Sequence, residues 1–209
     1  MPISRSPNLP GVIRRLNAVL QGKRHSLARK LRSPANPRDL EKLAKTFGRS
    51  DLRELNAIYA WHDGTRGEDT CFAGYYRWLP LQGALKEKRM LDGLQRDGHF
   101  SDWVAGDWWN QGWCPVCDFN GDLICVDVAG SLGLGNGVVF ERLNSDKRRS
   151  ILAPSVADWM NVYLHLTLAG PDEDDEDVWL DYWHGRKASQ IRKQLLPGYP
   201  KIIRARLAK

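Results

Sequence analysis

The residues best suited to chemistry gather at positions 108–127, which read WWNQGWCPVCDFNGDLICVD. Cys114 and Cys117 have the Cys-x-x-Cys spacing found in zinc knuckles and in redox motifs. A structural zinc site needs four ligands, and the other two cysteines and the five histidines form no second pair of this kind. A redox pair is expected at the start of a helix, where the helix dipole lowers the thiol pKa. The sequence therefore predicts no metal site and no cofactor, and it favours small buried thiols.

The same stretch has the pattern of a β-hairpin rather than of a helix start. Residues 112–117 and 123–128 are strand-like, and Asn120-Gly121 between them is a strong turn signal. Side chains alternate along a regular strand, so Cys114 and Cys117 are expected on opposite faces of the sheet.

Acidic side chains around the hairpin could in principle act as a catalytic pair. Asp118, Asp122 and Asp127 are close in sequence, and a buried member could serve as a general acid or base. Turn and strand-end roles explain the same residues without catalysis. No serine, cysteine or histidine nucleophile arrangement is recognisable, so the sequence predicts no catalytic residues and a protein that is not an enzyme.

The tryptophan-rich segment 101–111 allows two interpretations. Trp108 and Trp109 lie beside Asp107, and aromatic residues among acids suit a protein interface, where tryptophan is a frequent hot spot. The same rings could instead fold back onto the core. Both alternatives stay open from the sequence, and negative neighbours disfavour nucleic acid as the partner.

The elements that must position these residues follow from apolar periodicity and turn signals. They form an α+β fold with a mostly antiparallel sheet flanked by helices and a C-terminal extension. The predicted helices are at about 12–20, 37–47, 51–62, 81–97, 155–170 and, in part, 178–196. The predicted strands are at about 74–81, 112–117, 123–128, 138–143 and 148–152.

Charge divides the chain into three parts. Residues 1–50 carry 12 basic and 2 acidic residues, whereas residues 51–170 carry 11 and 16. We predict a basic N-terminal arm at 1–36 with a short amphipathic helix at the domain edge, and an α+β domain at 37–170. An acidic loop with a partly helical basic tail is predicted at 171–209. The arm is expected to be a solvated helix face, with nucleic acid or an acidic partner as alternatives.

No apolar run is long enough to span a bilayer, and the first residues lack the apolar core of a secretory signal. A cytoplasmic protein is expected.

Four segments together resemble the SUKH superfamily, over roughly residues 11–170. They are LRELNAIYAWHDG, LPLQGAL, WWNQGWCPVCDFNGDLICVDVAG and GNGVVFERLNSDKRRSILAPSVADWM. The matching positions are His62, Asp63, Gly64, Leu79, Pro80, Leu81, Trp113, Pro115, Gly121, Asp122, Asp127, Gly137, Val138, Ser155 and Trp159. The turn departs from the pattern at Asn120-Gly121-Asp122, where relatives often have an extra glycine, and residues 171–209 lie outside it.

The resemblance implies an immunity protein that neutralises a secreted bacterial toxin of the type VI or contact-dependent polymorphic kind. Such protection needs tight binding, with a Kd near or below ~1 nM. We expect the toxin contacts to include Trp108, Trp109, Asp107 and Asp118, and also the acidic run of Asp172, Glu173, Asp174, Asp175, Glu176 and Asp177. An acidic surface suits a basic toxin, for example one that targets nucleic acid.

Two other functions remain open. One is a regulatory protein-interaction module without a toxin partner, as among eukaryotic relatives of the superfamily. The other is a nucleic-acid-binding protein that uses residues 5–49 and 201–209, which predicts a steep dependence of binding on salt.

Overall fold

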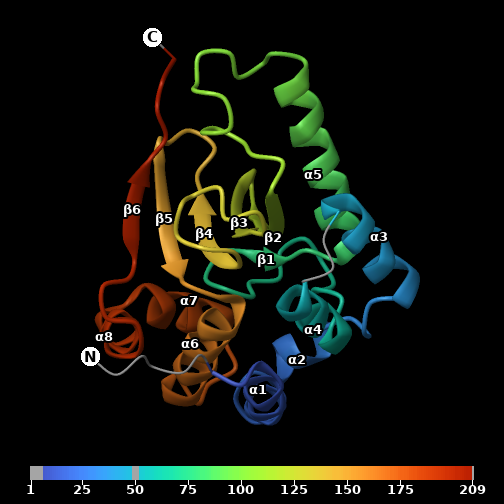
Figure 1. Cartoon of the computed structure of the whole chain (residues 1–209). Coiled ribbons are helices and arrows are strands. Elements are labelled where there is room, and N and C mark those ends of the chain that lie inside the picture. The colour runs from blue at the N-terminus through green and yellow to red at the C-terminus, as the bar shows by residue number, and fades with distance from the viewer. Residues whose placement is uncertain (1–6, 49–51, 209) are drawn as a thin grey trace.

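The structure, a computed structural model, describes residues 7–48 and 52–208. In these ranges eight helices and one six-stranded sheet form an α+β fold (Figure 1). The helices are α1 Leu9–Lys23, α2 His25–Lys30, α3 Pro37–Phe47, α4 Arg53–Trp61, α5 Leu81–Arg96, α6 Val156–Ala169, α7 Glu176–His184 and α8 Arg186–Leu195. The strands are β1 Arg77–Trp78, β2 Trp113–Phe119, β3 Asp122–Asp127, β4 Val138–Arg142, β5 Arg148–Ala153 and β6 Lys201–Arg204.

The sheet is an antiparallel meander in the order β1 to β6. At the predicted hairpin, Asn120 has φ 51° and Gly121 has φ 87°. Two successive residues with positive φ are the signature of the type I′ turn that Asn-Gly favours, because this turn matches the twist of the strands. The predicted fold class and the hairpin are confirmed.

Strand β2 is not regular, and this changes where its thiols point. The register with β3 shifts between Pro115 and Cys117, so Val116 is an extra residue. A bulge of this kind reverses the alternation of side chains beyond it. Cys114 and Cys117 therefore both face the same hydrophobic core, and the expectation of opposite faces is wrong.

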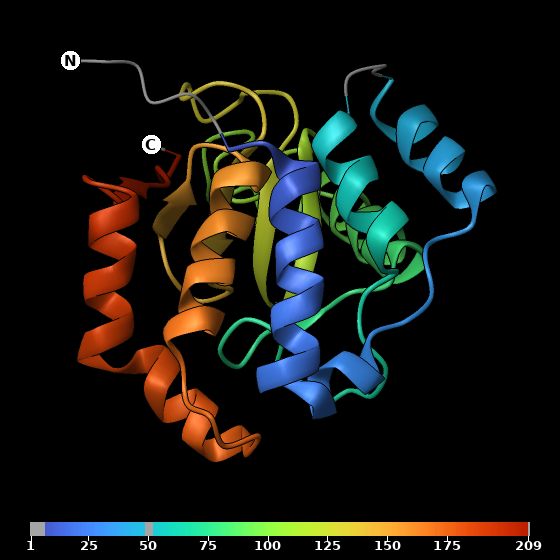
Figure 2. The same cartoon turned by 90° about the horizontal axis from the view of Figure 1, so that it is seen from below.

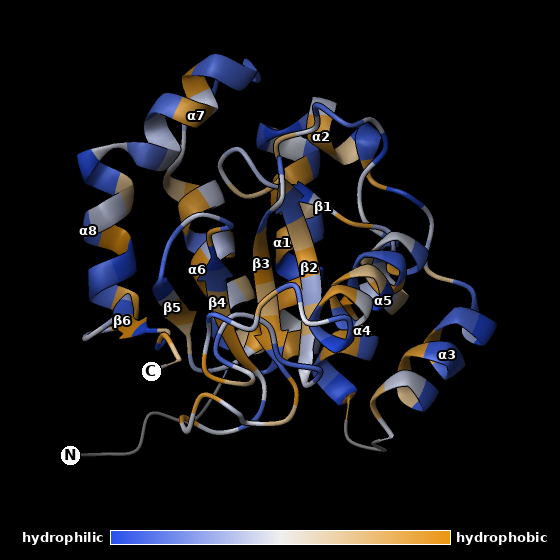
Figure 3. Cartoon of the chain, turned by 90° about the horizontal axis from the view of Figure 1, so that it is seen from above, coloured by the Kyte–Doolittle hydropathy of each residue, from blue (hydrophilic) through white to orange (hydrophobic). Residues whose placement is uncertain are grey.

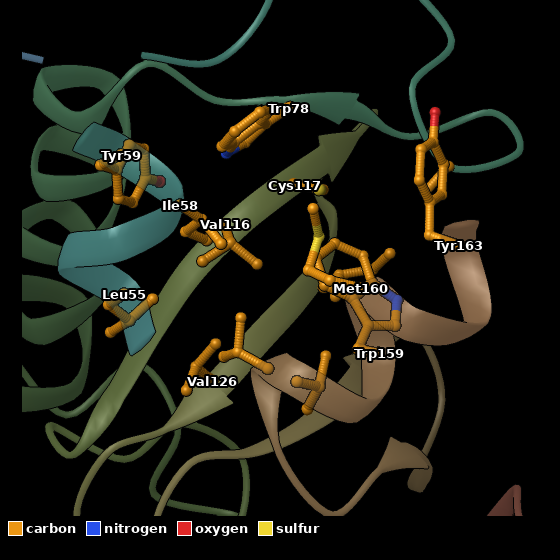
Figure 4. Close-up of a cluster of buried hydrophobic side chains, with 14 of the residues drawn as sticks. Leu55, Ile58, Tyr59, Trp78, Val116, Cys117, Val126, Trp159, Met160 and Tyr163 are labelled. Carbon is orange, nitrogen blue, oxygen red and sulfur yellow. The ribbon is translucent and has the colours of Figure 1, made fainter. Parts of the chain in front are cut away.

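Helices cover one face of the sheet and enclose the larger core. Figure 2 shows α6, α1 and α4 side by side across this face. Figure 4 shows the core between them, with Tyr59 from α4, Cys117 from β2 and Met160 from α6 pointing toward one another. The opposite face carries a second core, covered by α5 and by the tryptophan-rich segment before β2.

Local signals set two of these helices as predicted. The Asn36 side chain accepts a hydrogen bond from the Arg38 backbone N–H at 2.9 Å, with Pro37 at the first position of α3. Ser155 caps α6 by accepting from the Asp158 N–H at 3.0 Å. Residue 51, the predicted start of the helix at 51–62, lies outside the described residues, and α4 is described from Arg53.

The N-terminal helices pack on the domain. Leu16 and Leu20 of α1 are fully buried in the larger core, and α1 lies against α6. Lys23 at its end donates to the Gly170 carbonyl at 3.2 Å. Only the outer face of α1 is solvated. The division into arm, domain and tail stays a prediction, although contacts cross its first boundary.

The C-terminal segment adds two helices and an edge strand. Trp179 of α7 is buried, and α8 packs on α6 around Ala188. Strand β6, which the sequence did not predict, pairs with β5 from Ile151↔Lys201 to Arg148↔Arg204. Figure 3 shows the apolar residues concentrated on the central strands, with hydrophilic residues over much of α3, α7 and α8. Among the described helices, none is long and apolar enough to cross a membrane.

Candidate partner-binding surface

The two tryptophans expected at an interface lie in the core. Trp109 is 0% exposed and Trp108 is 8% exposed. The Trp109 Nε1–H donates to Asp92 at 2.8 Å, and the Arg142 guanidinium lies 3.7 Å from the centre of the Trp108 ring. Of the two interpretations of this segment, the structure supports the core for both rings, because the segment folds onto the second core. We therefore leave both out of the partner surface proposed below.

Asp107 holds the C-terminal tail against the same segment. Its carboxylate accepts from the backbone N–H of Arg206 at 2.7 Å and from the Arg206 side chain at 2.8 and 2.9 Å. These hydrogen bonds lower the pKa of Asp107 below its ordinary value. The residue is thus an internal anchor in this structure.

Much of the acidic run is also used internally. Asp172 pairs with Lys23 at 2.8 Å, and Asp174 accepts from the Ser26 N–H at 2.7 Å. Asp175 caps α7, and Glu176 accepts from the Cys71 N–H at 3.0 Å. These contacts tie α7 to the domain, so the predicted acidic loop is anchored at several points.

The side chains of the other two residues of the run, Glu173 and Asp177, contribute little to this anchoring. The Glu173 carbonyl accepts from the Trp179 indole at 2.8 Å, while the Glu173 and Asp177 side chains are exposed.

Asp118, another predicted contact residue, borders an open hollow. It pairs with Arg77 at 3.0 Å across the β1–β2 ladder and accepts from the Gly121 N–H at 3.1 Å. The pair forms one wall of a hollow of 540 Å³. We call this region the Tyr75 surface and define it by Glu68, Asp69, Tyr75, Arg77, Asp118 and Phe119.

Two exposed aromatic rings form the centre of the Tyr75 surface. Tyr75 is 48% exposed and Phe119 is 39% exposed, and the rings stack with their centroids 5.3 Å apart. His184 of α7 also stacks on Tyr75, with the ring centroids 4.8 Å apart. Large exposed rings in a hollow are the kind of feature that a protein partner covers.

The rim of this surface is acidic. Glu68, Asp69 and Asp118 supply three carboxylates against the single guanidinium of Arg77. Arg77 is itself engaged with Asp118 and lies 3.8 Å from Glu68. The surface therefore presents aromatic rings surrounded by net negative charge.

Sequence reasoning missed Tyr75, Arg77 and Phe119 as surface residues. One signal was present, because Tyr75 and Arg77 alternate with Tyr76 and Trp78 in GYYRWLP and so share a face. Trp78 is buried, which turns its neighbour Arg77 outward.

The thiols offer neither a metal site nor an activated nucleophile in this structure. All four cysteines are free, and Cys114, Cys117 and Cys125 are buried. Burial raises the pKa of Cys114 to about 12 and also raises the pKa of Cys117 above its ordinary value. No group of three or more potential metal ligands occurs in residues 7–48 and 52–208.

Fold and surface together define an α+β protein with a six-stranded antiparallel meander and a hollow suited to protein binding. The family model of the SMI1 / KNR4 family (SUKH-1) matches residues 34–162. The chain belongs to this family, and the resemblance to the SUKH superfamily is confirmed. The match excludes α1, α2, α7, α8 and β6. No curated protein matches the chain.

Proposed function

We propose that this chain is a cytoplasmic immunity protein that neutralises a cognate secreted bacterial toxin by tight, non-catalytic binding. The toxin would be of the type VI or contact-dependent polymorphic class. Membership of the SMI1 / KNR4 family supports the proposal. The proposed contact site rests on one observation, the stacked and exposed pair of Tyr75 and Phe119 within an acidic rim.

The chemistry of the Tyr75 surface fits a basic partner. Aromatic faces attract lysine and arginine side chains, and the effect grows when the pair is desolvated. The surrounding carboxylates speed association with a basic toxin and disfavour acidic competitors. Tyrosine is also frequent among interface hot spots. Glu173 and Asp177 also stay in the proposed contact set because their side chains are exposed.

The test begins with the tagged full-length chain recovered from its native host at moderate salt, and with identification of what co-purifies. A stoichiometric partner that carries a secretion-linked toxin domain is expected. That toxin is then expressed with the wild-type chain in a growth assay. Absence of any toxin-domain partner, in cells shown to make the candidate toxins, would contradict the immunity function and favour a regulatory module.

Paired variants test the surface separately from the function. The Tyr75→Ala/Phe119→Ala variant is expected to bind the toxin about 100-fold more weakly, because it removes both rings. A matched control, Met90→Ala/Leu134→Ala, removes two other exposed apolar side chains and should bind like wild type. If the toxin binds but the Tyr75/Phe119 variant retains full affinity, the contact surface lies elsewhere and the immunity function stands.

A further inference from the structure

A cavity of 340 Å³ lies where the C-terminal segment meets the family domain. One side is formed by α6 with strands β3 to β5, and the other by α7, α8 and the residues before β6. The family match ends at residue 162, so the second wall is an addition to the matched region. The volume is at the lower end of the range for small-molecule sites.

The walls of this cavity are mainly aromatic and apolar. Trp159 and Tyr163 of α6 line one side of it, and Figure 4 shows both on the same helix. Trp183 and Tyr199 line it from the C-terminal segment. The Tyr163 and Trp183 rings lie 5.5 Å apart, so the two halves of the wall are in contact. The body of a ligand here would be apolar or aromatic.

One wall carries a carboxylate that can accept further hydrogen bonds. Glu141 of β4 accepts from the Tyr76 hydroxyl at 2.8 Å through Oε1. Its Oε2 accepts no hydrogen bond from any residue that the structure describes. An ionised carboxylate in a partly apolar site is stabilised by a cationic donor.

The opposite wall carries a guanidinium that is already held in place. Arg192 of α8 donates from Nη1 to the Trp183 carbonyl at 3.0 Å and stacks 4.9 Å from the centre of the Trp183 ring. Its Nε and Nη2 have no hydrogen-bond partner among the described residues. A planar fork with two remaining donors fits a carboxylate.

His184 also lines the cavity, and both charged groups act on it electrostatically. Partial burial lowers its pKa, Arg192 lowers it further, and Glu141 acts in the opposite direction. Its ring is therefore neutral at neutral pH. The cavity thus offers one negative and one positive group with no net charge. Arg192 would repel a simple cation, and Glu141 would repel a simple anion.

We propose that this cavity binds a small zwitterion of the chemical class of a free α-amino acid with an apolar or aromatic side chain. The ammonium group pairs with Glu141, and the carboxylate pairs with Arg192. The aromatic walls enclose the side chain. The amino-acid site does not depend on the proposed toxin binding. The cavity is next to the Tyr75 surface, because His184 lines the cavity and stacks on Tyr75.

The ligand chemistry is tested on the full chain by isothermal titration calorimetry and by tryptophan fluorescence, since Trp159 and Trp183 line the cavity. The probes are L-leucine, L-phenylalanine and L-tryptophan, with the last followed by calorimetry alone. At least one is expected to bind. For L-phenylalanine the matched fragments are phenethylamine, which lacks the carboxylate, and 3-phenylpropionate, which lacks the ammonium group.

Each fragment is expected to bind at least ten-fold more weakly than L-phenylalanine. If none of the three amino acids binds at millimolar concentration, the proposal is overturned. If phenethylamine binds as well as L-phenylalanine, the site recognises a cation and the zwitterion proposal is also overturned.

Two variants assign the charged groups. Glu141→Gln keeps an acceptor for the Tyr76 hydroxyl and is expected to reduce affinity at least ten-fold. Arg192→Gln should do the same. The matched controls are Asp181→Asn on α7 and Lys193→Gln on α8, both exposed and outside the cavity lining. Circular dichroism confirms folding of all four, and unchanged affinity in a folded Glu141→Gln variant would overturn the assignment of the ammonium site.

Discussion

Arg206 donates from Nε and Nη2 to the two carboxylate oxygens of Asp107, at 2.8 and 2.9 Å. The pair joins the C-terminal tail to the segment that carries Trp108 and Trp109. The Val104 N–H also donates to the Arg206 carbonyl at 2.9 Å, so the tail lies along this segment through both backbone and side chain. Residues nearly one hundred positions apart thus stabilise each other.

This pair predicts a specific loss of stability in acid. The hydrogen bonds from Arg206 hold the pKa of Asp107 below its ordinary value of 3.8. The carboxylate therefore contributes fully above the unfolded-state pKa, and its contribution is lost as the pH falls through the folded-state pKa. Urea unfolding should show wild type more stable than Asp107→Asn at pH 7, with the difference shrinking as the pH falls below 3.8 and through the folded-state pKa.

The control for this prediction is Asp102→Asn, because the Asp102 side chain is exposed in the same segment. It should unfold like wild type across the pH range. A difference between Asp107→Asn and wild type that stays constant down to pH 2 would contradict a role for the Asp107 charge.

Gly74 is predicted to be required for docking of α7. It has φ 63°, and a Cβ there would lie 2.8 Å from Cδ1 of Trp183. Gly133 has φ 73° and no atom within 4 Å of the same position. Both alanine variants incur the left-handed backbone penalty of about 1–2 kcal/mol. Only Gly74→Ala must also displace Trp183, which adds about 1–3 kcal/mol.

Thermal and urea unfolding of the two glycine variants measure the additional loss of stability that displacement of Trp183 causes. We expect Gly74→Ala to lose more stability than Gly133→Ala, and limited trypsin digestion to cut it faster at Arg186 and Lys187. Equal losses in the two variants would show that Trp183 is not held against the domain as described.

Arg142 is predicted to be essential to the second core. It is buried, and it donates to the carbonyls of Trp108 and Gly121, each at 3.4 Å, while stacking on the Trp108 ring. Burial lowers its pKa to about 10, so it stays charged at neutral pH. Arg142→Met keeps the apolar stem but leaves the carbonyls without these donors, which should cost about 2–4 kcal/mol.

Arg148→Met on β5 is the matched control, because Arg148 is exposed and pairs only locally with Asp146. Its free energy of unfolding should equal that of wild type within error. Chemical denaturation followed by tryptophan fluorescence measures both variants. A loss in Arg142→Met no larger than that in Arg148→Met would refute the role of the buried guanidinium.

The sequence predicted the features whose causes are local. The Asn120-Gly121 turn, the helix that begins after Ser155 and the amphipathic helix α1 depend on neighbouring residues, and all three are confirmed. The Val116 bulge was not predictable in this way, because it depends on how β2 and β3 align. The burial of Arg142 could not be predicted from the sequence either, since a charged residue on a strand is ordinarily expected to face solvent.

The candidate surface illustrates the same limit. Asp118 was identified from the hairpin alone, but its neighbours Tyr75 and Arg77 lie about forty residues earlier, in the turn before β1 and in β1 itself. Only the pairing of β1 with β2 brings them together. All six residues of the acidic run were predicted to contact the toxin. In the structure, three of them instead form internal contacts with Lys23, Ser26 and Cys71.

Thiol reactivity provides the last prediction and tests the interpretation of Cys-x-x-Cys as core residues. Cys114, Cys117 and Cys125 are buried, and Cys71 is partly exposed. Burial, with Glu176 nearby, raises the pKa of Cys71 from 9.0 to about 11. At pH 8 its thiolate fraction should be about 100-fold below that of an ordinary cysteine. Labelling with a thiol-specific disulfide reagent should therefore modify one slow cysteine in the folded chain and four in denaturant.

The variant Cys71→Ser provides the control for this assignment. Its folded form should show no labelling on the same timescale, while three thiols should react after unfolding. Rapid native labelling of Cys114 or Cys117, located by peptide mass spectrometry, would place the pair in an accessible, activated setting. Such a result would contradict their packing against the core and reopen the redox interpretation of the motif.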